Sequence, residues 1–358
     1  MPLLHFTPVQ SLLGGLTLGA ATAGKLLNTG RVLGISGTAK GLVNGDTQSW
    51  RISFLGGMAA GACLLVTTMP SALEQLPATY SLQRAVAAGL LVGVGSSMGN
   101  GCTSGHGICG VSRLSKRSLV YTGTITLAGA AAAVASNVAG ALQIARQPAT
   151  YLPPTTPVLQ LGMALLGSAA LLMVGVGWLG NKLKARMPAA SSSPTAKKRA
   201  QQAQLRSLNL AGEAAAGALF ALGLGVSGMT RPSKIAGFLD VSSPAWDASL
   251  LFLMGGAVVV SLPAFQYTMR CLAASKAGQG SQPCEPSCGK VFQLPANNTI
   301  DSRLVLGGLL FGAGWGMGGL CPGPALVALV RPSQQLLGFC GAMIAGWWLE
   351  PQLARLLI

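Results

Sequence analysis

Two glycine-rich stretches of this chain read almost alike: LLVGVGSSMGNGC at residues 90–102 and LLFGAGWGMGGLC at residues 309–321. Aligned without a gap, they share seven of thirteen residues, and each ends in a cysteine, Cys102 in the first and Cys321 in the second. The sequence therefore predicts two related halves, each with an apolar helix that breaks just before a thiol.

The composition is that of a protein built into a lipid bilayer. Half of the 358 residues are hydrophobic, only 9% are charged, and the mean hydropathy is +0.54, whereas a soluble domain carries about 25% charged residues. The 50 glycines fit this class, since small residues let membrane helices approach closely. Basic loops on the inner side of a membrane explain the net charge of +16, and the low aromatic content argues against nucleic acid as a partner.

Crossing a bilayer takes about 20 apolar residues, and on this basis the sequence predicts about nine transmembrane helices. Their approximate ranges are 8–27, 50–70, 82–101, 118–142, 156–180, 209–227, 246–268, 303–320 and 334–350. Four pieces too short to span lie between them, at 30–44, 103–115, 229–240 and 322–331. We expect these to be re-entrant helices, because broken backbone at membrane depth must be covered by protein or a water-filled cavity. The predicted fold class is an all-α polytopic membrane protein.

The most basic segment sets the predicted orientation. Residues 182–206 contain seven Lys or Arg and no acid, which places this linker on the cytoplasmic side. Five spans precede it, so the N-terminus lies outside, and the first apolar stretch has no basic n-region and is retained as a span. The predicted parts are a first repeat (1–145), a connecting helix (146–181), the linker (182–206), a second repeat (207–350) and a tail (351–358). The plasma (inner) membrane is the default location.

The first half begins outside and the second begins inside, so the two repeats are predicted to have inverted topology. Inverted repeats are typical of secondary transporters, whose site lies near the midplane between discontinuous helices. We therefore expect Cys102 and Cys321 to meet near the pseudo-two-fold axis. A weaker upstream match places Arg31 on Lys234. These cations either attract an anion at opposite mouths of the pathway or snorkel to the interface.

The residues around both cysteines resemble a known family. GNGCTSGHGICGVSRLS at 99–115 and GMGGLCPGPAL at 316–326 look like the two signatures of the YeeE/YedE-type sulfur-transport family, and SGMTRPSKIAGFLD at 227–240 resembles the element before the second signature. The resemblance implies a membrane protein that takes up thiosulfate or a related sulfur-containing anion, with Cys102 and Cys321 holding its terminal sulfur through S–H···S contacts. Thiosulfate-transporting members carry a further cysteine in the first repeat, but the matching residues 24–37 contain none here.

The neighbours of the first cysteine are candidates for the same pathway. A neutral thiol is a weak donor that can hold a soft sulfur, so we expect the thiols to be protonated and not joined as a disulfide. Thr103 and Ser104 either donate to the oxygens of the anion or cap the short helix after them. His106 is a candidate donor or gate residue and Cys109 a candidate relay thiol, with packing as the alternative for each. No zinc site is predicted from Cys102, His106 and Cys109, because their spacing is unlike that of zinc ligands.

For the remaining charged residues and cysteines, the sequence mainly predicts ion pairing, packing or a place at the membrane interface. Lys25 falls within the first span, where a charge is costly and functional by default, although snorkelling at the helix end is equally compatible. Asp240 is a candidate partner of Lys234. Cys284 and Cys288 lie in a hydrophilic loop assigned to the cytoplasm, where thiols are expected to stay reduced. Packing or interfacial roles are expected for Cys63, Cys271 and Cys340.

The favoured function is a transporter or channel for uptake of thiosulfate-like anions, passed along the cysteines by S–H···S and backbone N–H contacts. No nucleotide-binding motif is present, so transport is expected to be passive or ion-coupled. The alternatives are a transporter of another sulfur or selenium compound or small solute, and a membrane sulfurtransferase or redox protein using Cys102 and Cys109. We predict no enzymatic activity, cofactor or metal. The expected partners are the anion, the bilayer and a cytosolic sulfur carrier or sulfurtransferase.

Overall fold

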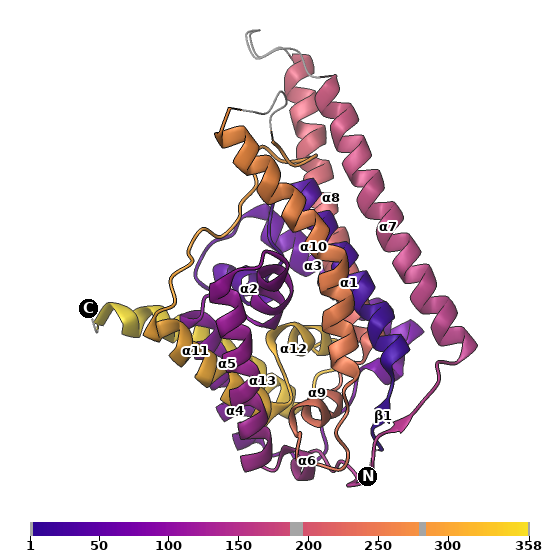
Figure 1. The fold of residues 1–358 in the computed structure, drawn as a ribbon, viewed down its shortest axis with the longest axis vertical. Coiled ribbons are helices and arrows are strands. Elements are labelled where there is room, and N and C mark those ends of the chain that lie inside the picture. The colour runs from indigo at the N-terminus through magenta and orange to yellow at the C-terminus, as the bar shows by residue number, and fades with distance from the viewer. Residues whose placement is uncertain (1–2, 187–195, 279–283, 357–358) are drawn as a thin grey trace.

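The computed structural model describes residues 3–186, 196–278 and 284–356. Strands among these residues are limited to β1 (His5–Phe6), which pairs in parallel with β2 (Thr150–Tyr151). Figure 1 shows the helices gathered along one long axis, with α7, α8 and α10 extending beyond the others at one end and the N-terminus at the opposite end. The all-α prediction is confirmed.

Every predicted span and every short piece corresponds to a helix. The long helices are α1 (Pro8–Thr29), α3 (Ser49–Thr68), α4 (Leu82–Met98), α5 (Lys116–Ala135), α7 (Thr156–Ala185), α8 (Ala196–Ser227), α10 (Ser249–Lys276), α11 (Ser302–Gly318) and α13 (Gln334–Leu356). The short ones are α2 (Ile35–Val43), the π-helix η2 (Thr103–Gly110), α9 (Pro232–Leu239) and α12 (Pro322–Ala328), besides the single turns η1 (Pro70–Ala72) and α6 (Val138–Ala141).

Within the described residues, five helices are long and apolar enough to cross a membrane: α3, α5, α7, α8 and α10. The number becomes seven when each of the bent pairs α4–η2 and α11–α12 is counted as one span. The total of about nine therefore stays a prediction. The predicted span 118–142 also differs at its end, because Asn137 has a left-handed φ of 48° and its side chain accepts a hydrogen bond from the Gly140 N–H, which caps α6.

Helices extend into both ends of the basic segment 182–206, which the sequence predicted to be a linker. α7 continues to Ala185 and α8 already begins at Ala196, while residues 187–195 lie outside the described part of the chain. The stretch AKKRAQQAQLR at 196–206 consists of Ala, Lys, Arg, Gln and Leu, which are all strong helix formers. Charged residues favour water but can still form a helix, so α8 begins at Ala196, before the apolar stretch predicted from residue 209.

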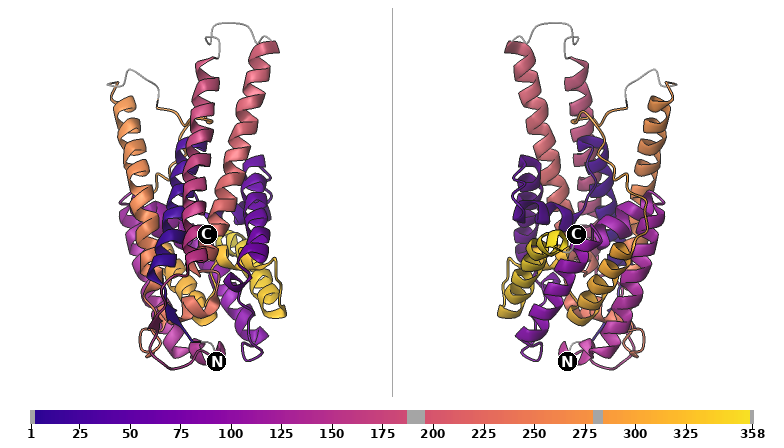
Figure 2. Two further views of the ribbon diagram at one scale, coloured as in Figure 1. Left: turned by 90° about the vertical axis from the view of Figure 1, so that its right-hand side faces the viewer. Right: turned by 90° about the vertical axis from the view of Figure 1, so that its left-hand side faces the viewer.

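The two halves pack as expected for a pseudo-two-fold rotation with inverted topology. α1 packs against α10, while its counterpart α8 packs against α3; likewise α4 packs against α13, while α11 packs against α5. The counterparts also contact each other, α1 with α8 and α4 with α11. Ser11 at the start of α1 donates to the Ser227 carbonyl at the end of α8, and Lys25 near the end of α1 pairs with Glu213 near the middle of α8, so the two run antiparallel. α7 lies beside this pair (Figure 2).

Glycines bring helix backbones of the two halves into contact. A Cβ added to Gly57 of α3 would lie 1.9 Å from the Ala214 carbonyl oxygen of α8, and one added to Gly217 would lie 2.0 Å from the Phe54 carbonyl oxygen. No side chain fits at such distances, so α3 and α8 touch backbone to backbone at this crossing. This is the use of small residues expected where helices pack inside a bilayer.

Gly57→Ala is therefore expected to destabilise the fold strongly, because the two helices must move apart, at a cost of about 1–3 kcal/mol for an overpacked site. The thermal unfolding midpoint of the purified protein in detergent measures the effect. The neighbouring Gly56 is the matched control, since a Cβ there would meet nothing within 4 Å. A Gly57→Ala midpoint equal to that of Gly56→Ala would contradict the close contact.

Candidate functional site

Cys102 and Cys321 occupy the same structural position in the two halves. Cys102 immediately precedes η2 and Cys321 immediately precedes α12, each in extended backbone with φ/ψ of −136°/−170° and −129°/168°. Each short helix is bent away from the helix before it, by 44° for α4–η2 and 40° for α11–α12. Both cysteines are 1% exposed and carry free thiols. The repeat seen in the sequence is therefore also a repeat in local structure.

The helix breaks have an evident cause in the residues before each cysteine. α4 ends at Met98, and Asn100 takes a left-handed φ of 57°. α11 ends at Gly318 and is capped by Gly319 at φ 63°, where a Cβ would also lie 2.8 Å from the Pro232 carbonyl oxygen. Glycine and asparagine adopt this conformation most readily, so the chain turns there and starts a new helix in another direction.

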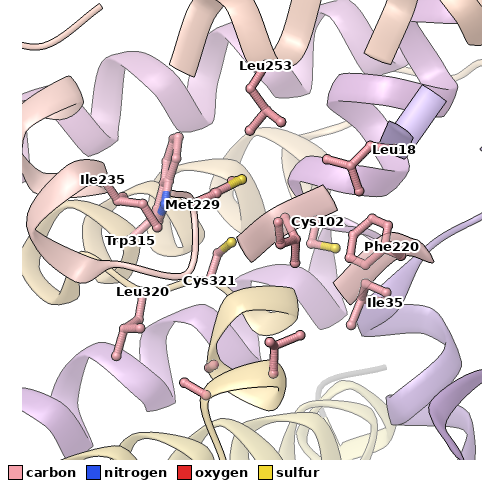
Figure 3. Close-up of a cluster of buried hydrophobic side chains, with 14 of the residues drawn as sticks. Leu18, Ile35, Cys102, Phe220, Met229, Ile235, Leu253, Trp315, Leu320 and Cys321 are labelled. Atoms are coloured by element: carbon pink, nitrogen blue, oxygen red, sulfur yellow. The ribbon is translucent and has the colours of Figure 1, made fainter. Parts of the chain in front are cut away.

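Hydrogen bonds connect the two cysteine segments. The Thr103 hydroxyl lies 3.8 Å from the Cys321 sulfur and is placed to donate to it, which joins η2 to α12. The Cys102 sulfur lies 3.3 Å from the Ser104 hydroxyl oxygen, which also accepts a 3.4 Å bond from the Ile35 N–H of α2. Figure 3 shows both thiols in one buried cluster with Phe220 and Met229 of the second half and Leu18 of the first.

A small cavity of about 20 Å³ lies at this cluster. Polar atoms reach it from Thr103, Ser104 and Cys321, and the rest of its wall is mainly apolar. Its apolar lining consists mainly of Leu18, Ile108, Phe220, Leu224, Met229, Leu253 and Met254. A space of this size holds about one water molecule. The cavity beside the thiols therefore admits no larger solute in this conformation.

His106 and Cys109 are tied to the protein backbone and side chains. The two ring nitrogens of His106 lie 3.0 Å from the Ser118 hydroxyl and 3.1 Å from the Gly99 carbonyl, so the protein itself satisfies the ring. The Cys109 thiol donates to the Leu33 carbonyl at 3.1 Å, which ties η2 to the connector between α1 and α2. The described residues contain no cluster of His, Cys, Asp and Glu that could hold a metal ion.

Arg31 and Lys234 do not occupy equivalent positions. α1 and α8 both end in a left-handed glycine, Gly30 and Gly228, which puts Arg31 in the connector before α2 but Lys234 inside α9. The Lys234 ammonium is 2.7 Å from an Asp247 carboxylate oxygen and also bonds to the His5 carbonyl and the Thr7 hydroxyl. Its carboxylate partner is thus Asp247, seven residues beyond the Asp240 that the sequence suggested, and the ammonium is fully engaged.

Glu213, which is fully buried in α8, was not among the residues predicted from the sequence to be functional. Its carboxylate pairs with the Lys25 ammonium and, at 3.2 Å, with the Arg31 guanidinium, and Lys25 also lies 4.1 Å from the centre of the Phe54 ring. Lys25 is 0% exposed, so it does not snorkel. Glu213 is the sole acid within the predicted span 209–227. An isolated acid in an apolar span was the signal that could have revealed it.

The hydrophilic loop before α11 also departs from expectation. Cys284 forms a disulfide with Cys271 of α10, whereas both were expected to be free. Cys288 keeps its thiol, buried beside α7, where it donates to the Val176 carbonyl at 3.6 Å. The N–H groups of Ser287 and Cys288 bond to the last carbonyls of α1. The loop is therefore anchored to the bundle rather than free in solvent.

Comparisons with known proteins agree with this architecture. Residues 4–132 match the sulphur transport family, and residues 209–357 match a family of unknown function, DUF6691. Two proteins of Xylella fastidiosa (strain Temecula1), each described as a probable transporter, are 40% identical to the chain: one over 132 residues (37% of this chain, 81% of the relative), the other over 127 residues (36% and 93%). Each relative is thus less than half as long as this chain, in keeping with its two halves. The chain belongs to the sulphur transport family of membrane proteins.

Proposed function

We propose that this membrane sulfur transporter carries thiosulfate or a closely related sulfur-containing anion past Cys102 and Cys321. The observation that supports this most is the symmetric placement of the two thiols, each directly before a short helix at the break of an inverted half. In inverted-repeat transporters the substrate site lies at such discontinuous helices. Two copies of one thiol at equivalent breaks fit a substrate handed from one half to the other.

The chemistry around the thiols fits a sulfur oxyanion. A protonated thiol offers a soft sulfur atom and a weak donor to the terminal sulfur of thiosulfate without holding it tightly. The Thr103 and Ser104 hydroxyls, which contact the two cysteine sulfurs, can turn to donate to the sulfonate oxygens instead. Cys109, held by the Leu33 carbonyl, is the next thiol along η2 and would act as a relay only after that bond breaks.

Passage requires movement, since a cavity of about 20 Å³ is far too small for the anion. The bond between the Ser104 hydroxyl and the Ile35 N–H ties η2 to α2, and the Thr103–Cys321 contact ties η2 to α12. Both must open for an anion to pass. In this proposal the end where α7 and α8 are joined faces the cytoplasm of a plasma membrane, and a sulfur carrier or sulfurtransferase there receives the sulfur.

Uptake of radiolabelled thiosulfate by cells that lack their own thiosulfate transport tests this function. We expect saturable uptake in cells producing the chain and competition by selenosulfate, but weaker competition by sulfate, which has no terminal sulfur. Uptake no greater than in cells without the chain would refute the proposed substrate. Mass spectrometry of the protein after exposure addresses the enzymatic alternative, since a sulfurtransferase would carry a persulfide on Cys102 or Cys109.

A further inference from the structure

A second, larger cavity of about 300 Å³, called here the vestibule, lies at the connector between α1 and α2. Its lining comes from residues 32–34 and 36–38, residues 99–101 after α4, the middle of η2, the starts of α3 and α5, and the loop before α11. Three arginines from different elements, Arg51, Arg113 and Arg117, line it, and none of its lining residues is an acid. A concave wall whose charged side chains are all basic raises the local concentration of anions.

Arg113 is the arginine of this group that is least engaged by the protein. Arg51 is held by the Asp46 carboxylate at 2.6 Å, and Arg117 bonds to the Thr299 carbonyl and lies 3.7 Å from an Asp301 oxygen. Arg113 donates to the Pro295 carbonyl at 2.8 Å. Among the described residues it has no ion pair with a carboxylate, and its buried Nε has no hydrogen-bond partner. Its charge is therefore open to an external anion.

The N-terminus of α2 lines the same cavity. Ser36, the second residue of this nine-residue helix, is 2% exposed, and its buried hydroxyl oxygen has no hydrogen-bond partner within the described part of the chain. Gly34 and Gly37 also line the vestibule, and a Cβ on either would meet nothing within 4 Å, so the backbone is open there. The first N–H groups of a helix lack intrahelical partners and favour negative charge.

In the second half of the chain, a carboxylate of the protein itself binds at the start of α9, the helix that corresponds to α2. Ser233 is the second residue of α9, as Ser36 is of α2, and its N–H donates to the Glu74 carboxylate at 3.0 Å. Arg331 corresponds to Arg113, since each lies two residues before the serine whose side chain caps the next long helix. There the cavity, lined by Glu74, Pro232 and Arg331 among others, measures only about 10 Å³.

We propose that the vestibule is a binding site for a doubly charged tetrahedral oxyanion, held by the first turn of α2, the Ser36 hydroxyl and the Arg113 guanidinium. The inference rests on the proposed function, because such a site would hold the transported anion next to the cysteine segments. In the second half the protein's own Glu74 carboxylate takes the equivalent position, and in the first half no carboxylate of the described residues does. This site recognises charge and oxygen atoms, so unlike the thiols it does not require a terminal sulfur.

Binding of radiolabelled sulfate to the purified full-length protein tests the site directly. We expect saturable binding to the wild type and a loss of affinity of about tenfold or more in Arg113→Gln, the effect of removing one hydrogen bond to a charged group. Ser36→Ala keeps every charge but removes one hydrogen bond to the anion, so it should weaken binding about tenfold. The matched control is Arg270→Gln, which removes the same charge from an exposed residue of α10 outside the vestibule.

The outcomes separate this site from the proposed transport function. Cys102→Ala and Cys321→Ala should bind sulfate as the wild type does, even though they are expected to lose thiosulfate uptake. If the wild type fails to take up thiosulfate but binds sulfate through Arg113, the substrate assignment falls and the vestibule site stands. Absence of sulfate binding, or equal affinity in Arg113→Gln, Ser36→Ala and the wild type, would overturn the site.

Discussion

Cys321→Ala and Cys102→Ala are each expected to reduce thiosulfate uptake by about ten- to a hundredfold, the effect of losing one hydrogen bond between a thiol and a charged substrate in a desolvated site. The two cysteines are 1% exposed and hold equivalent positions before η2 and α12, so neither can replace the other along the route. Initial uptake rates in intact cells, normalised to the amount of protein in the membrane, measure the effect.

The chain supplies two controls of the same residue type. Cys340 is 4% exposed in α13 and makes no hydrogen bond to any of the described residues, so Cys340→Ala reports what the loss of a buried thiol does to packing alone. Cys63 is exposed, and Cys63→Ala reports any effect of general thiol chemistry. Both should transport as the wild type does. Uptake by Cys102→Ala and Cys321→Ala that matches these controls would eliminate the thiol mechanism.

Glu213→Gln is expected to lower the stability of the fold far more than the loss of an exposed ion pair does. The change removes the carboxylate that compensates Lys25, a fully buried ammonium, and leaves a second cation, Arg31, beside it. Breaking a buried pair in this way costs about 3–5 kcal/mol. Thermal unfolding in detergent should show a lowered midpoint for Glu213→Gln.

Two further variants identify the cause of that loss. The double variant Glu213→Gln with Lys25→Met removes both charges and should recover much of the lost stability, since the cost arises from one uncompensated charge. Glu285→Gln breaks the pair between Lys184 and Glu285, whose side chains are 24% and 42% exposed, and should change stability by less than about 1 kcal/mol. A Glu213→Gln midpoint like that of Glu285→Gln would show that the buried pair is not structural.

Most of the fold could be predicted from the internal repeat in the sequence. A match between residues 90–102 and 309–321, together with the parity of the predicted spans, was enough to predict inverted halves and two equivalent cysteines at helix breaks. These features are local, because glycine spacing and apolar length decide where a helix can break and where it can cross a bilayer. The structure also shows a helix at every predicted span and short piece.

Ion pairs and disulfides between residues that only the folded chain brings together could not be predicted from the sequence. Asp247, not Asp240, reaches Lys234 because residues 241–247 turn back so that the Asp247 N–H bonds to the Gly237 carbonyl. The Lys25–Glu213 pair joins residues 188 positions apart, and Cys271 meets Cys284 only because the loop before α11 folds back on α10. The sequence alignment of Arg31 with Lys234 wrongly predicted equivalent positions, because the connectors after Gly30 and Gly228 differ in length.

The peripheral helix α7 determines how a single chain can hold two opposed halves. The pairing of β1 with β2 places residues 5–6 beside residues 150–151, so the first half starts and finishes at the same end of the molecule. The second half must start at the other end, and α7 carries the chain there while burying only 17% of its most apolar window. Separate polypeptides of half this length need no such helix, because each can insert with its own orientation. Because α7 joins the two halves covalently, their opposite orientations are fixed relative to each other within one polypeptide.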